Sequence, residues 1–263
     1  MRLAAVVAGL MMSASSVTAD PVEPITPWNI SYEESQCTAS RSYGSAEKPI
    51  TLRLVPSVTG AAMRLLFVED GKTAVSENPA ELTLGTQKTL HTYSFNYDVP
   101  TKHHRVYLVN MPMAEFRTAA AASTIGMKSG SFKSTLHVDQ LPQMLAELDK
   151  CLADLQDYWN VKNIGPARTV PNSGKEVGVF SGDDYPGFAL RYGQAGTFGM
   201  TILIDQRGRV ADCTVDEPSG TSILDVASCY LVEKRAKFLP ASDAQGKPTR
   251  SAVSMRVMWR ISG

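Results

Sequence analysis

The chain has 263 residues, and its 26 Lys and Arg side chains are balanced by 26 Asp and Glu side chains. The basic residues are scattered along the sequence, whereas nucleic-acid binders concentrate them on one face. We therefore do not expect nucleic acid as a partner. At about 150 residues per domain, the length predicts two ordinary domains.

The first 19 residues predict a secretory signal peptide. The apolar run from Leu3 to Met12 is about half of the roughly 20 residues that a membrane-spanning helix needs. Small residues at Val17-Thr18-Ala19 suit a signal peptidase. We expect cleavage between Ala19 and Asp20, a periplasmic location and no membrane insertion afterwards. Retention of the segment as an uncleaved anchor is the alternative.

Alternating apolar and polar residues between Trp28 and Val109 predict a series of strands. The clearest runs are Leu52 and Leu54, Leu65 and Phe67, and His91, Tyr93, Phe95 and Tyr97. Turn-forming residues separate the strands at 69–72 and 76–79.

Two helices are expected after these strands, a short one at Glu115–Ser123 and a longer one at Asp139–Tyr158. The longer helix carries an apolar stripe that should pack on the sheet. The stripe consists of Leu141, Leu145, Leu148, Leu152 and Leu155. We therefore predict an α+β domain over residues 20–160.

Catalytic and metal-binding motifs are missing from this sequence. His103 and His104 are adjacent, so in a strand they would point to opposite faces and could not readily share one metal ion. The sequence has no GxSxG, HExxH, P-loop or dinucleotide glycine motif. We expect no enzyme activity, no cofactor and no metal. The alternative is that the N-terminal domain is an enzyme or small-ligand binder with the C-terminal domain as its docking module. It would have a deep pocket between Tyr93, Phe95, Tyr97 and the helix at 139–158.

Glycine and proline interrupt the pattern over residues 161–181, which we predict to be a linker. A second domain is expected over 182–263, in the order helix, strand, strand, helix, strand. Its helix near Tyr185–Ala189 is followed by a hairpin whose turn is Asp205–Gly208. A helix capped by Ser222 runs to about Ala236. The final alternating strand completes a three-stranded antiparallel sheet.

Four cysteines in an exported chain predict disulfides rather than metal ligands. Three pairings exist, and we favour Cys213 with Cys229 and Cys37 with Cys151, because each pair then stays within one predicted domain. Four free buried thiols are the alternative.

Three motifs in the second domain resemble the TonB C-terminal domain family over about residues 184–261. They are Tyr185-Pro186 followed by Gly193 and Gly196, the segment IDQRGRV at 204–210, and the SG of 219–220 with the later LD and FLPA. The resemblance does not extend to residues 20–165.

The resemblance implies that the last strand accepts an extended segment of an envelope protein as an added strand, in association with TonB-dependent transmembrane transport. The positions implied on that strand are Ala252, Val253, Ser254, Met255, Arg256, Val257, Met258 and Trp259. Positions implied just before and within the Tyr-Pro motif are Gly182, Asp183, Asp184, Tyr185 and Pro186.

Two departures from the family narrow this expectation. Asp183 and Asp184 stand where familiar members have neutral polar residues, and the sequence offers neither a retained membrane helix nor a Pro-rich spanner. We therefore expect partner binding rather than energy transduction. The partner would be an outer-membrane receptor or another TonB-like protein, and pairing of the strand with its own copy in a homodimer is a third reading.

Overall fold

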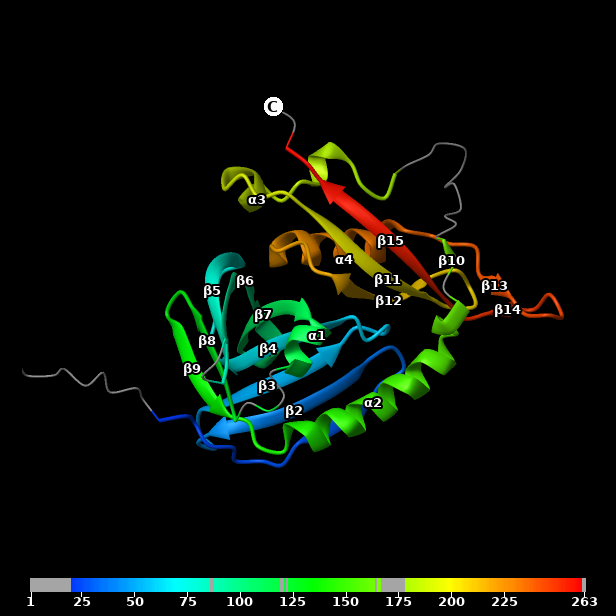
Figure 1. Ribbon diagram of the computed structural model, residues 1–263. Helices are drawn as coiled ribbons and strands as arrows, with labels where there is room; N and C mark the ends of the chain where they lie inside the picture. The colour runs from blue at the N-terminus through cyan, green and yellow to red at the C-terminus, as the bar shows by residue number, and fades with distance from the viewer. Residues whose placement is uncertain are drawn as a thin grey trace, which may run out of the picture.

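The computed structural model describes residues 20–85, 88–118, 121, 123–163, 165–166 and 178–261. The predicted signal peptide and most of the predicted linker lie outside these residues. The described chain forms a large sheet and a smaller one, each with an attached helix (Figure 1). The predicted α+β class with two domains is confirmed.

The larger sheet has nine antiparallel strands in the order β1-β2-β3-β4-β7-β6-β5-β8-β9. Their bounds are β1 Asn29–Tyr32, β2 Cys37–Gly44, β3 Pro49–Pro56, β4 Ala62–Asp70, β5 Ser76–Leu84, β6 Lys88–Val99, β7 His104–Pro112, β8 Thr124–Ser129 and β9 Phe132–His137. The segment just before β1 joins β9, at one end of this sheet, to the part of β2 that β1 leaves unpaired near the other end. The Val22 N–H donates to the Thr135 carbonyl at 2.7 Å, and the Gly44 N–H donates to the Glu23 carbonyl at 2.9 Å. The sheet therefore curves far enough for its two ends to share one segment.

The long helix α2 (Leu141–Tyr158) packs on this sheet as its apolar stripe predicts. All five stripe leucines are buried, together with Leu52, Leu54 and Phe67 of the sheet. A disulfide between Cys37 and Cys151 ties α2 to β2, which confirms the predicted pairing of these two cysteines. Figure 1 shows α2 running along β2.

Local boundaries differ from the expectation in two places. The short helix α1 covers Met113–Thr118 and so begins two residues earlier than expected, with Met113 and Phe116 as its buried residues; residues 119, 120 and 122 of the predicted span lie outside the described residues. Strands β8 and β9 were not predicted, although Ile125, Met127, Phe132 and Leu136 are buried in the core.

The smaller sheet has the order β10-β15-β11-β12. Its elements are β10 (Gly165–Pro166), β11 (Gly196–Ile204), β12 (Val210–Glu217) and β15 (Ser251–Trp259), with η3 (Gly182–Asp184), α3 (Gly187–Arg191) and α4 (Ser222–Arg235). A two-stranded ribbon of β13 (Ala241–Ser242) and β14 (Pro248–Thr249) precedes β15. Strands β11, β12 and β15 form the predicted three-stranded antiparallel sheet, and β10 adds two parallel residues at the far side of β15.

Helix α4 covers one face of the smaller sheet. Phe198, Met200 and Ile202 of β11 share a core with Val232 of α4. The disulfide between Cys213 and Cys229 joins β12 to α4, which confirms the predicted pairing of these two cysteines. The hairpin turn needs its glycine, since a Cβ at Gly208 would lie 2.0 Å from the Phe238 carbonyl oxygen.

The two sheets pack against each other. Helix α4 contacts β6 and β7 as well as its own sheet, and Figure 1 shows it between the two. Leu203 and Ala252 of the smaller sheet belong to the core cluster of the larger one. Within the described ranges no helix is both long and apolar enough to cross a membrane.

Candidate functional site

Strand β15 has one fully paired side and one largely open side. Along its whole length it pairs with β11, from Gly196 opposite Trp259 to Ile204 opposite Ser251. Among the described residues its other side pairs only with Gly165 and Pro166, opposite Val253 and Ser254. The outer backbone edge from Met255 to Trp259 is therefore available for pairing.

The side chains of β15 alternate between solvent and core. Ser254, Arg256 and Met258 are exposed, and Met258 reaches 54% exposure. Met255 and Val257 are half-buried against the core under α4. The remaining predicted positions Ala252, Val253 and Trp259 are buried. Only part of the predicted set can therefore offer side chains to a partner.

An open hollow lies on the face of the smaller sheet opposite α4. Arg256, Gly199 and Glu217 are direct neighbours across β15, β11 and β12, and Arg256 Nη2 donates to Glu217 Oε1 at 2.5 Å. Because Gly199 has no side chain, the surface over β11 is lower than the surface over the neighbouring strands β15 and β12. The hollow measures about 420 Å³ and is lined by Thr59, Ala61, Gly199, Met200, Asp216, Glu217, Ser254, Met255 and Arg256.

Asp184 holds the segment before α3 in place. It accepts bonds from the Ser181 N–H at 2.7 Å and from Arg235 Nη1 and Nη2 at 2.7 Å each. The Arg235 guanidinium and then the Ser181 hydroxyl hold the pKa of Asp184 far below its usual range. Gly182 and Asp183 beside it are exposed. Asp184 is thus committed to an internal ion pair, while its two neighbours face solvent.

Tyr185 anchors the same segment to the end of β15. Its hydroxyl donates to the Gln194 carbonyl at 2.6 Å, and its ring meets the edge of Trp259 at 5.1 Å between centroids. The Trp259 Nε1 in turn donates to Ser228 Oγ of α4 at 2.9 Å. Pro186 follows in an extended conformation that starts α3. The two groups of predicted positions therefore meet at the C-terminal end of β15.

Glu77 caps α4 from the other sheet, a role that the sequence did not reveal. The predicted cap Ser222 is the first helical residue, and its hydroxyl donates instead to the Tyr93 carbonyl at 2.8 Å. The Glu77 carboxylate accepts the Ile223 N–H at 2.7 Å and Gln194 Nε2 at 2.6 Å. Burial is the main cause of a raised pKa at Glu77. The predicted turn at 76–79 is wrong, because these residues start β5 and Glu77 is 1% exposed.

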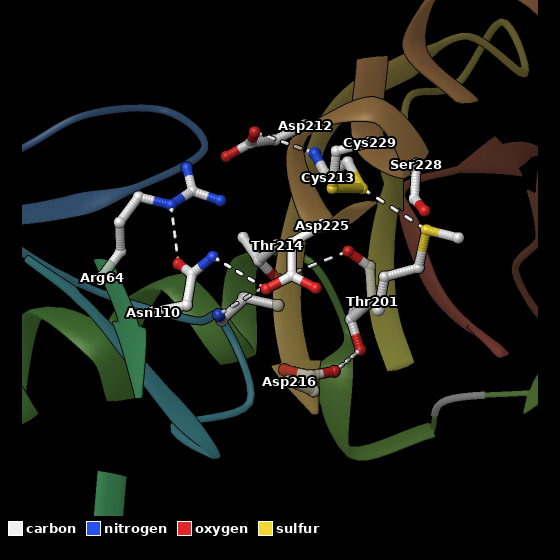
Figure 2. Close-up of a disulfide and its surroundings, with 12 residues drawn as sticks. Arg64, Asn110, Thr201, Asp212, Cys213, Thr214, Asp216, Asp225, Ser228 and Cys229 are labelled. Atoms are coloured by element: carbon white, nitrogen blue, oxygen red, sulfur yellow. Dashed lines mark hydrogen bonds between the residues drawn. A yellow bond between two sulfur atoms is a disulfide. The ribbon is translucent and has the colours of Figure 1, made fainter. Parts of the chain in front are cut away.

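Asp225 forms a second buried contact between the sheets (Figure 2). Arg64 Nε donates to Asn110 Oδ1 at 3.3 Å, and Asn110 Nδ2 donates to Asp225 Oδ2 at 3.2 Å. The Ser219 N–H donates to Asp225 Oδ1 at 2.9 Å. Burial raises the pKa of Asp225 to about 6. The SG-x-x-x-LD motif thus has a physical reason, since its last carboxylate binds its first backbone amide.

Arg250 fixes the start of β15 on the larger sheet's helix. Its guanidinium lies 4.2 Å from the Tyr158 ring centroid and 5.8 Å from that of Trp159. Its Nη2 is 3.5 Å from Glu34 Oε1. Both the helix and the edge strand of the smaller sheet are therefore attached to the N-terminal domain.

The pocket predicted between the β6 aromatic residues and α2 does not form. Phe95 and Tyr97 pair with Leu108 and Val106, whose side chains lie on the face toward α4, whereas α2 packs on the opposite face. An open hollow of about 340 Å³ lies beside Tyr93, and its other lining residues are Pro79, Ala80, Glu81, His91, Thr92, Lys128 and Gly130.

His103 lies in a turn, and His104 is the first residue of β7. His103 is in the left-handed region with φ of 52°, and His104 Nε2 is 3.5 Å from Asp70 Oδ1. In the part of the chain that the structure describes, no three His, Cys, Asp or Glu side chains gather in a way that could hold a metal ion.

Comparison with curated proteins and with solved structures gives no match. A family model does match, over residues 182–261, and its description is the Gram-negative bacterial TonB protein C-terminal. This range begins at η3 and contains α3, β11, β12, α4 and β15. It contains none of the nine-stranded sheet. Residues 182–261 therefore form a domain of the TonB C-terminal family.

Proposed function

We propose that this chain is a periplasmic TonB-family protein that binds an extended segment of an envelope protein by strand addition, in association with TonB-dependent transport. The segment would come from an outer-membrane receptor or another TonB-like protein. The observation that carries the proposal is the outer side of β15 from Met255 to Trp259, which is paired with none of the described residues.

Backbone geometry supports an added strand here. Pro166 has no N–H, so its pairing with Ser254 must use the Ser254 N–H as donor. Backbone groups alternate between the two sides of a strand, so those of Arg256 and Met258 also face outwards. An added strand would bond to these groups, and main-chain bonds of this kind supply affinity for any extended sequence.

Side chains beside the edge would supply selectivity. Arg256 and Met258 are exposed on one face, while Met255 and Val257 are half-buried on the other. A bound strand would therefore place alternate side chains beside a charged pair on one face and beside an apolar surface on the other. Gly182 and Asp183 are exposed before the Tyr-Pro motif, at the end of β15 where Tyr185 meets Trp259.

The N-terminal domain would serve as a rigid support in this proposal. Glu77 caps α4, and Arg250 anchors the residue before β15. Helix α4 is thus held by a side chain of the larger sheet, and the start of β15 is held by contacts with the helix that packs on that sheet. A partner would meet a fixed edge rather than a tethered module.

The test compares Arg256→Pro with Arg256→Ala in the full chain. Proline removes the outward N–H of Arg256, whereas alanine keeps it and loses only the side chain with its exposed ion pair. Tagged variants are incubated with solubilised envelope proteins, and captured proteins are quantified by mass spectrometry. We expect the alanine variant to retain the captured partner and the proline variant to lose it.

Circular dichroism and intact disulfides would establish that both variants are folded. Equal capture by the two variants would contradict strand addition. Equal loss would show that the Arg256 side chain, rather than the backbone, is recognised.

A further inference from the structure

The outer side of β15 already carries a short strand of the same chain. Gly165 and Pro166 form β10, which runs parallel to β15 opposite Val253 and Ser254. These residues precede the TonB C-terminal domain, which begins at residue 182. The pairing therefore belongs to the segment between the two domains and occupies the edge where an added strand would bind.

β10 overlaps the place that a partner strand would take. β15 covers nine residues, Ser251–Trp259, and its central residue is Met255. Strands in globular proteins usually have about five or six residues. A partner strand of that length centred on Met255 would reach Val253, where β10 is paired. The partner and β10 therefore compete for the same backbone groups.

The composition of β10 makes it easy to displace. Proline cannot donate to a strand ladder, and glycine has no side chain to pack in one. Gly165 thus supplies the only backbone N–H within the two residues of β10. A covered edge is also protected from pairing with other chains. The sequence of β10 suits a weak cover better than a permanent fourth strand.

We propose that β10 is an internal competitor that covers the β15 edge and is displaced by an extended partner segment running parallel to β15. This inference rests on the proposed function, because it assumes that the same edge receives the partner. It adds that the free protein holds its edge partly closed, and that binding requires the release of Gly165 and Pro166.

The test uses three variants of the full chain and one synthetic probe. Gly165→Pro removes the single N–H of β10, whereas Gly165→Val keeps this N–H and adds a side chain that favours strands. Gly174→Pro makes the same proline change elsewhere in the predicted linker and is the matched control. The probe is a fluorescent peptide with the sequence of residues 161–170, VKNIGPARTV.

Two measurements are made on each protein: amide hydrogen exchange of peptides covering residues 252–258, and peptide affinity by fluorescence anisotropy. We expect faster exchange and peptide binding at least about tenfold tighter in Gly165→Pro, because a tethered competitor acts at a high effective concentration. Gly165→Val should change both measurements in the opposite direction. Gly174→Pro should match the unaltered protein.

Unchanged exchange in Gly165→Pro would overturn the proposal, because β10 would then not protect the edge. Equal peptide affinity across all variants, including binding to none of them, would overturn the competition. Neither measurement uses an envelope partner. If no envelope partner is captured but the exchange and peptide results are as expected, only the proposed function is contradicted. If a partner is captured but the exchange and peptide results are not as expected, only this inference is contradicted.

Discussion

The buried carboxyl of Asp225 makes the stability of this protein depend on pH. Its side chain receives bonds from Asn110 Nδ2 and the Ser219 N–H, yet burial raises its pKa from 3.8 to about 6. One pKa unit corresponds to about 1.4 kcal/mol, so the ionised form costs the folded state about 3 kcal/mol. Because the pKa is higher in the folded state than in the unfolded state, protonation of Asp225 stabilises the folded protein. This stabilisation is fully present below pH 3.8 and is lost as the pH rises through 6.

Asp225→Asn should remove this dependence, because asparagine is neutral at every pH. Over pH 4 to 7.5 we expect the variant to lose about 2.5 kcal/mol less stability than the unaltered protein. Urea unfolding followed by tryptophan fluorescence at several pH values measures the difference. Burial also raises the pKa of Glu77, Asp212 and Glu233, so only the difference between the two proteins isolates Asp225.

Asp183→Asn is the matched control, because Asp183 is exposed and lies outside the contact between the sheets. It should leave the pH dependence unchanged. The same pH dependence in Asp225→Asn as in the unaltered protein would refute the reasoning. Burial between the two sheets would then not destabilise the ionised form of Asp225.

Three further predictions concern two contacts that hold the two domains together and the disulfide within the C-terminal domain. Glu77→Ala should destabilise the protein by about 2–3 kcal/mol, because the partly buried Ile223 N–H loses its acceptor, while Glu77→Gln should retain most of the stability in urea unfolding. Replacing Cys213 and Cys229 together by serine should cost about 3 kcal/mol in the chain-entropy model, and a change below 1 kcal/mol in a thermal melt would contradict it. Arg250→Ala should lower stability by about 1 kcal/mol through its lost ring contacts, with Arg260→Ala as an exposed control that should have no effect.

Regular patterns explain which parts of the fold were predictable. The leucine stripe of α2 and the alternation in β11 and β15 repeat at the helix and strand periods, so both type and buried face follow from local sequence. The disulfide pairing was predicted by keeping each pair of cysteines within one predicted domain. Strands β8 and β9 escaped prediction, although their buried positions also alternate, because Gly126 and Gly130 interrupt their short apolar runs.

The contacts between the domains could not be predicted in the same way. Glu77 and Ile223 are 146 residues apart, and nothing near either residue indicates the other. A single carboxylate beside Asn78 and Pro79 has the composition of a turn, and only the arrival of α4 makes it a buried cap. The open edge was predicted through the family resemblance, whereas its partial cover by β10 depends on chain geometry that no local pattern encodes.

The shared core has a consequence for cooperativity. Leu203 and Ala252 belong to the TonB C-terminal domain, yet they are buried with Trp159 and Val161 of the preceding segment. A fragment cut at residue 182 would present these two apolar side chains to water. The two domains should therefore unfold together as one cooperative unit, which is larger than residues 182–261. Calorimetry of the full chain should show one transition rather than two.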